Sequence, residues 1–123
     1  MAGDDAFDIP AHPERRFTAT GDLEYQGGVR FRLTPEGSLE GRAALVEAVL
    51  ADGPYRFGDF LELPMPVYLV RDEGTGDVFR VSVRDGAVRL HVLPTTGEAG
   101  LCAFYERLCA ASGTDWDVTR RRE

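Results

Sequence analysis

Residues 67–93, VYLVRDEGTGDVFRVSVRDGAVRLHVL, decide the fold of this chain. Apolar and polar residues alternate along the segment, and it is rich in Val, Leu, Phe and Tyr, which favour β-strands. Glycines interrupt the alternation twice, and such breaks mark turns. The pattern therefore predicts a meander of three consecutive antiparallel strands, over residues 67–72, 77–84 and 87–93.

The turn between the second and third strands fixes how they pair. Asp85-Gly86 is the strongest short-range signal for a two-residue type I′ turn, which needs a positive φ at both positions. This turn places Arg80 opposite His91, and a four-residue loop over residues 73–76 gives the first two strands a matching register. The apolar residues then share one face, which we expect to be the core face: Tyr68, Val70, Phe79, Val81, Val83, Val88, Leu90 and Val92.

The other face of the meander gathers basic side chains in a chain of net charge −7: Arg71, Arg80, Arg84, Arg89 and His91. Like-charged neighbours on adjacent strands repel unless an anion lies between them. Two interpretations stay open. Either the chain's own Asp and Glu side chains, or water, balance this face, or a carboxylate or phosphate of a ligand or partner does. Apolar residues on the same face predict partial cover by a chain segment or another subunit: Val67, Leu69, Val78 and Leu93.

Two further segments have the apolar spacing of amphipathic helices. The first is expected to follow Ser38 as N-cap and to end at Gly53-Pro54. The second runs from about Glu98 to Ala111, with a buried stripe formed by Leu101, Phe104, Tyr105 and Leu108.

A second hairpin is expected before the first helix. Residues 16–25 and 29–33 both contain strand-forming residues, and Gln26-Gly27-Gly28 between them suits a three-residue loop. This loop would pair Leu23 with Phe31 and keep the apolar residues on one face.

The remaining segments complete an α+β domain. A strand over residues 55–63, with a bulge at Gly58, and a short final strand over residues 114–120 are expected. The predicted fold is α+β: a mainly antiparallel β-sheet with two α-helices packed on one face. The chain is expected to form a single domain over residues 16–119. An N-terminal arm over residues 1–15 precedes it, and a C-terminal tail over residues 120–123 follows it.

Composition limits the classes of function. With 43% hydrophobic residues in 123 positions, the chain can bury a core without metals or disulfides. Its acidic balance disfavours nonspecific nucleic-acid binding, although Arg30, Arg32 and the terminal arginines form a local basic pattern. The segment 1–15 lacks the apolar core of a signal peptide, and no apolar run reaches membrane-spanning length. We therefore expect a cytoplasmic protein.

No catalytic or metal-binding motif stands out. Cys102 and Cys109 lie seven residues apart on one expected helix, about 10 Å, which is too far for a disulfide bond. Neither cysteine belongs to a CxxC pair, so no metal and no cofactor is expected. Gly97 and Gly100 do not have the spacing of a phosphate-binding loop.

The sequence favours a non-enzymatic binding or accessory protein. It would use Arg71, Arg80, Arg84, Arg89 and His91 to engage an acidic partner, an anionic ligand or a second subunit in a homodimer, because the arginine fork binds carboxylate or phosphate at two points. The alternative is a small enzyme that acts on an anionic metabolite with His91 as acid and base. That alternative needs a concave pocket and a carboxylate beside His91.

Overall fold

The computed structural model describes residues 7–10, 12–21, 23–35, 41–59, 67–84 and 86–122. In chain order its elements are β1 (Glu14–Phe17), β2 (Leu23–Gln26), β3 (Val29–Pro35), α1 (Arg42–Asp52), β4 (Tyr55–Asp59), β5 (Val67–Asp72), β6 (Val78–Arg84), β7 (Ala87–Val92), α2 (Glu98–Ser112) and β8 (Trp116–Arg122).

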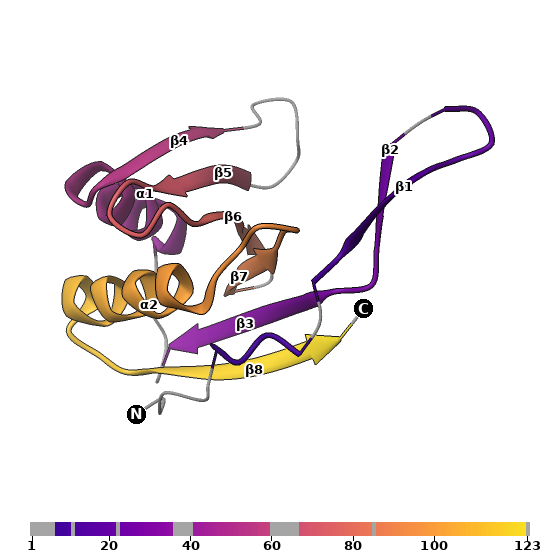
Figure 1. Cartoon of the computed structure of the whole chain (residues 1–123). Coiled ribbons are helices and arrows are strands. Elements are labelled where there is room, and N and C mark those ends of the chain that lie inside the picture. The colour runs from indigo at the N-terminus through magenta and orange to yellow at the C-terminus, as the bar shows by residue number, and fades with distance from the viewer. Residues whose placement is uncertain are drawn as a thin grey trace.

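The expected α+β class is confirmed. Strands β4-β5-β6-β7-β3-β8 form one sheet of six strands, and every pair of neighbouring strands in it is antiparallel. Both α1 and α2 cover one face of this sheet, and the β1–β2 hairpin projects from its end (Figure 1). Among the described residues, no helix is long and apolar enough to cross a membrane.

The meander adopts the register that its turns predict. Val70 pairs with Phe79, and Arg80 pairs with His91. Four residues, 73–76, lie between Asp72 and Asp77, and the Asp72 N–H donates to the Asp77 carbonyl across this loop at 2.8 Å. Gly86, in the next turn, has a φ of 74°, a conformation that favours glycine.

The core lies between the sheet and the two helices. Phe79 of β6 and Phe104 of α2 are both 0% exposed, and their ring centroids are 5.8 Å apart. Large aromatic side chains remove the most apolar area from water, so contacts of this kind dominate the stability of a domain of this size.

Part of the expected N-terminal arm is packed against this core. The ring of Phe7 is 1% exposed and lies 5.2 Å from Phe31 and 5.4 Å from Tyr105, between centroids. The Ile9 N–H donates to the Glu98 carboxylate at 3.2 Å, so the segment is also tied to the start of α2.

The expected pairing of residues 16–25 with residues 29–33 is wrong. Strand β2 pairs with β1 instead, with Leu23 opposite Phe17, and β3 lies between β7 and β8. The core-facing side chains of β3 are at most 3% exposed, in keeping with its place in the interior of the sheet. Gly27 and Gly28 both have positive φ, 76° and 103°, and they redirect the chain at this joint.

Three smaller expectations also differ from the structure. Strand β8 runs to Arg122 and pairs along the full length of β3, so the backbone of residues 120–122 belongs to the sheet. Gly58 pairs with Leu69 in an unbroken register, so β4 has no bulge over its described length. Helix α1 begins at Arg42 after Gly41, while the expected N-cap Ser38 and residues 60–63 lie outside the described residues.

The start of α2 is capped from a distance by Asp77. Its carboxylate accepts hydrogen bonds from the Gly97 N–H at 3.0 Å and the Gly100 N–H at 2.7 Å. A Cβ at either glycine would lie 2.6 Å from a carboxylate oxygen of Asp77, so both positions need glycine for close approach. The two glycines thus bind an anion, but the anion is the chain's own carboxylate.

Replacing Asp77 with alanine is expected to lower the free energy of unfolding by about 1–3 kcal/mol, because two amide groups at a helix N-terminus lose a charged acceptor. Urea denaturation measures the change. Asp115→Ala, at an exposed position, is the matched control, and equal stabilities of the two variants would contradict the capping role.

Candidate functional site

The sheet face turned away from the helices carries a row of basic side chains. The strand registers align Arg80 of β6 with His91 of β7, His91 with Arg30 of β3, and Arg30 with Arg121 of β8. A second row beside it aligns Ser82, Arg89 and Arg32. We call this surface the arginine face and define it by Arg30, Arg32, Arg80, Arg84, Arg89, His91 and Arg121.

The imidazole of His91 lies at the centre of the first row. Its Nε2 atom is 3.0 Å from the Ser82 hydroxyl oxygen, at hydrogen-bonding distance. Burial, followed by the positive charges of Arg80, Arg30 and Arg89, lowers the pKa of His91 from 6.5 to about 4. The ring is therefore neutral at physiological pH, with one nitrogen that donates and one that accepts.

The arginine face is closely packed although neither α1 nor α2 covers it. Ser82 and Val67 lie on this face and are only 4% and 7% exposed. The Nε atom of Arg80 is buried and has no hydrogen-bond partner among the described residues. Arginine side chains can lay their aliphatic stems along a surface while the charged group reaches outward.

Three of the five residues predicted from the sequence lie together in the structure. Arg80, Arg89 and His91 lie together on adjacent strands. Arg84 is exposed at the end of β6, opposite Ala87. Arg71 is in another row, where the Glu73 carboxylate lies 3.7 Å from its Nε atom.

Glu73 also binds the Nε atom of Arg56 at 2.6 Å. The interpretation that the chain's own carboxylates balance the charge thus applies to Arg71.

Sequence reasoning did not assign Arg30, Arg32 and Arg121 to this site. The alternation of β3 already placed Arg30 and Arg32 opposite its core residues. Because the sequence pattern predicts that β3 pairs with residues 16–25, it does not predict that β3 lies beside β7. The sequence also predicts a solvated tail from residue 120 onward, so it does not predict that Arg121 aligns with Arg30.

The cavity beside the arginine face is small. A cavity of about 90 Å³ lies beside Arg80 and His91, and Pro13 and Gly27, at the base of the β1–β2 hairpin, also line it. Binding sites for small molecules have typical volumes of about 300–1,000 Å³. No carboxylate lines this cavity among the residues that the structure describes.

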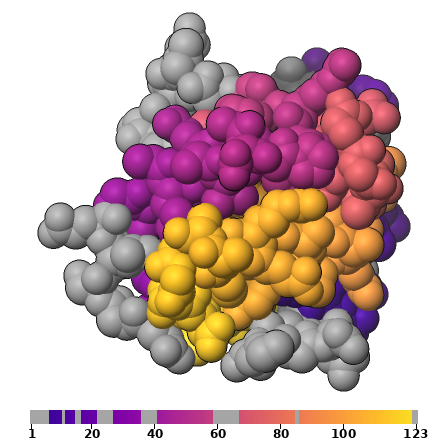
Figure 2. Space-filling model, turned by 90° about the vertical axis from the view of Figure 1, so that its left-hand side faces the viewer, coloured from indigo at the N-terminus to yellow at the C-terminus, as the bar shows by residue number. Residues whose placement is uncertain are grey.

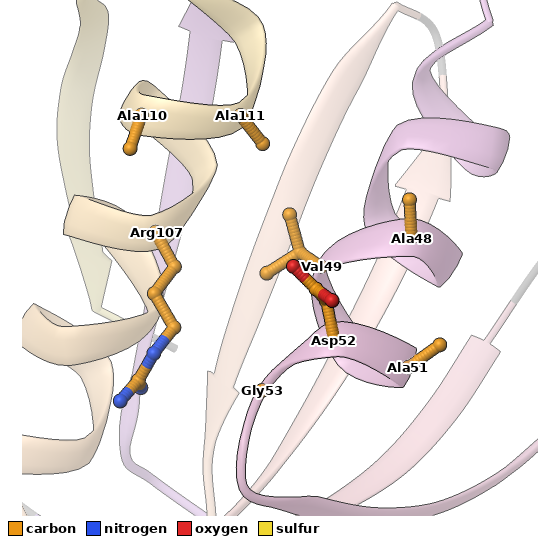
Figure 3. Close-up of a pocket in the computed structure, with 8 residues that line it drawn as sticks. All are labelled: Ala48, Val49, Ala51, Asp52, Gly53, Arg107, Ala110 and Ala111. Carbon is orange, nitrogen blue, oxygen red and sulfur yellow. The ribbon is translucent and has the colours of Figure 1, made fainter.

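A larger groove, of about 640 Å³, lies on the opposite side of the molecule. Figure 2 shows α1 and α2 side by side on that side, and Figure 3 shows the groove between them. Four alanines line it, and Arg107 contributes its stem while its guanidinium donates to the Tyr55 hydroxyl at 2.7 Å. This lining offers little polar chemistry.

The described residues contain no cluster of His, Cys, Asp and Glu that could hold a metal ion. Comparison of the chain with protein-family models, with curated proteins and with solved structures finds no match. The interpretation of this site therefore depends on its own geometry and charge.

The depressed pKa of His91 has a direct spectroscopic consequence. We expect its ring to titrate near pH 4 in an NMR experiment. Arg80→Ala is expected to raise this pKa toward 6.5, because Arg80 is the largest charge contribution to the shift. Arg120→Ala, which removes a charge that does not contribute to this shift, is the control, and a pKa of His91 that Arg80→Ala leaves unchanged would contradict the electrostatic explanation.

The same shift makes stability depend on pH. Between pH 6.5 and about 4 the unfolded chain binds a proton at His91 and the folded chain does not, so stability falls as the pH falls. The full loss is about 3 kcal/mol, and it is absent above pH 7. Urea denaturation at several pH values should show a smaller acid loss for His91→Gln than for the unchanged chain. Parallel pH curves for the two proteins would count against this linkage.

Proposed function

We propose that this chain is a cytoplasmic, non-enzymatic binding or accessory protein that engages carboxylate or phosphate groups with its arginine face. The observation that carries the proposal is the alignment of Arg80, His91 and Arg30 on three adjacent strands, with Arg89 in the neighbouring row. Side chains opposite one another on adjacent strands have Cβ atoms about 5 Å apart, so their charged groups can converge on one anion.

The electrostatics of His91 support an anion as the ligand. Three guanidinium charges act on a partly buried group, and together with burial they keep its imidazole neutral. A guanidinium group offers five donors and holds its charge at every physiological pH. An acidic group placed here would gain charge-assisted hydrogen bonds, which are the stronger kind.

Charge also distinguishes between the partners that this face could take. A symmetric dimer places the same patch of both subunits in contact, and here it would set arginine against arginine. Like charges across an interface oppose association. The arginine face therefore suits an acidic partner or a small anion better than a second copy of the chain.

The enzyme alternative receives less support from the site. A general base works best when its pKa is near the working pH, and that of His91 is about 4. The adjoining cavity of about 90 Å³ is also small for a metabolite. Both properties favour binding over catalysis.

A double variant, Arg80→Ala with Arg89→Ala, tests the proposal. We expect hexaglutamate peptide and inorganic phosphate to raise the pKa of His91 in the unchanged chain, because a bound anion offsets the nearby positive charge. The double variant should bind either probe at least about tenfold more weakly by calorimetry, since each lost charge-assisted bond costs about 1.5–3 kcal/mol.

Arg120→Ala is the control, because Arg120 pairs with Asp8 away from the arginine face. Equal binding by the double variant and the control, or no binding of either probe to the unchanged chain, would refute the proposal. Binding of a short single-stranded DNA instead of both probes would assign the face to nucleic acid.

A further inference from the structure

Strand β4 lies at the edge of the sheet and presents an exposed aromatic residue. It is the terminal strand in the order β4-β5-β6-β7-β3-β8. Phe57 of β4 is 41% exposed, and its cross-strand neighbour on the adjoining strand, Val70, is 1% exposed. An edge strand offers unpaired backbone groups to another chain, and proteins usually protect such edges.

The register shows which backbone groups of β4 point outward. The Glu73 N–H donates to the Pro54 carbonyl at 2.7 Å, so position 54 faces β5. In an antiparallel ladder the direction alternates along the strand. The backbone groups of Arg56 and Gly58 therefore face β5, whereas the N–H and C=O of Phe57 point away from the sheet.

We infer that two copies of this chain join through β4, antiparallel, about a twofold axis at Phe57. In this arrangement Phe57 pairs with Phe57 of the second copy, and their outward N–H and C=O groups exchange hydrogen bonds. Arg56 of each copy lies opposite Gly58 of the other. The pairing continues the sheet across the two subunits.

Gly58 makes this pairing sterically possible. A Cβ at Gly58 would have nothing within 4 Å, so the space above it is open. This space belongs to a groove of about 500 Å³, which Leu69 also lines. The aliphatic stem of the opposing Arg56 can lie across Gly58 and cover Leu69, which is 43% exposed.

The helix side of the strand is also self-complementary. The ring of Phe57 packs edge-on against Tyr68, with centroids 6.3 Å apart, and part of it stays uncovered. Two Phe57 rings opposite each other would cover one another, and aromatic pairs across strands are stabilising. Around Phe57, β4 is therefore complementary to an antiparallel copy of itself. This complementarity favours a second copy of the chain over an unrelated segment as the occupant.

The dimer would place both arginine faces on the same side of one continuous sheet, because Arg56 and Gly58 share that side with Leu69 and Arg80. A partner with two acidic segments could then bind both faces, and binding at one face raises the effective concentration at the other. The dimer itself does not depend on the proposed function, because it uses a different part of the surface.

Analytical ultracentrifugation of the full chain at increasing concentration tests the inference. The unchanged chain should sediment as a dimer at high concentration. Phe57→Pro removes the outward N–H without removing a bond to β5, and proline is tolerated on edge strands in this orientation. Gly58→Arg places a second guanidinium opposite Arg56. Each variant should weaken dimerisation at least about tenfold, a loss of about 1.4 kcal/mol.

Two further variants complete the design. Gly58→Glu sets a carboxylate opposite Arg56 and should weaken the dimer less than Gly58→Arg does, because its charge attracts the guanidinium, whereas Arg80→Ala with Arg89→Ala should leave the dimer unchanged. Circular dichroism confirms that each variant is folded, and Gly58→Arg covers the case in which Phe57→Pro does not fold. A monomer for the unchanged chain at all concentrations, or a dimer that persists in Gly58→Arg, would overturn the inference.

Hydrogen exchange supplies a site-specific measurement. The Phe57 amide should become protected as the concentration rises, while the Arg56 and Gly58 amides, which face β5, are protected at every concentration. Protection of Phe57 that does not change with concentration would also overturn the inference.

Discussion

Burial of one face of the sheet beneath α1 and α2 is the constraint on which the rest of the structure depends. The aromatic and aliphatic side chains of this face, among them Phe31, Phe79 and Leu90, are fully buried. Since successive residues of a strand point to opposite faces, this burial also decides where every intervening side chain lies. The arginine face is therefore a direct product of core formation: the same alternation that buries Phe31 presents Arg30 and Arg32 on the other side.

The electrostatic character of the molecule follows from this separation. A chain with net charge −7 gathers basic residues on one surface of its sheet, while two of its carboxylates serve local roles elsewhere. Asp77 caps α2, and Glu73 bridges Arg56 and Arg71. The positive potential of this surface is evident at His91, whose pKa is lowered by burial and by the charges of Arg80, Arg30 and Arg89. Overall acidity thus says little about the local chemistry of this face.

The sequence predicted those parts of the fold that depend on short-range signals. Tight turns at Gly86 and over residues 73–76 determine the meander register, and the apolar stripe of α2 determines its buried side. The position of β3 could not be predicted, because nothing local distinguishes a hairpin arm from a strand that pairs with segments far along the chain. The candidate site was incomplete for the same reason: Arg30 and Arg121 reach it only through these long-range pairings.

The central place of β3 has a consequence for the order in which the chain folds. Strands β5, β6 and β7 are joined by short loops and can pair early, since closing a small loop costs little entropy. Strand β3 must then find β7, whose paired residues lie 55 to 61 positions along the chain, and β8, whose paired residues lie 81 to 93 positions along the chain. Proteins dominated by such distant pairings fold slowly, so completion of the sheet at β3 is the expected rate-limiting step.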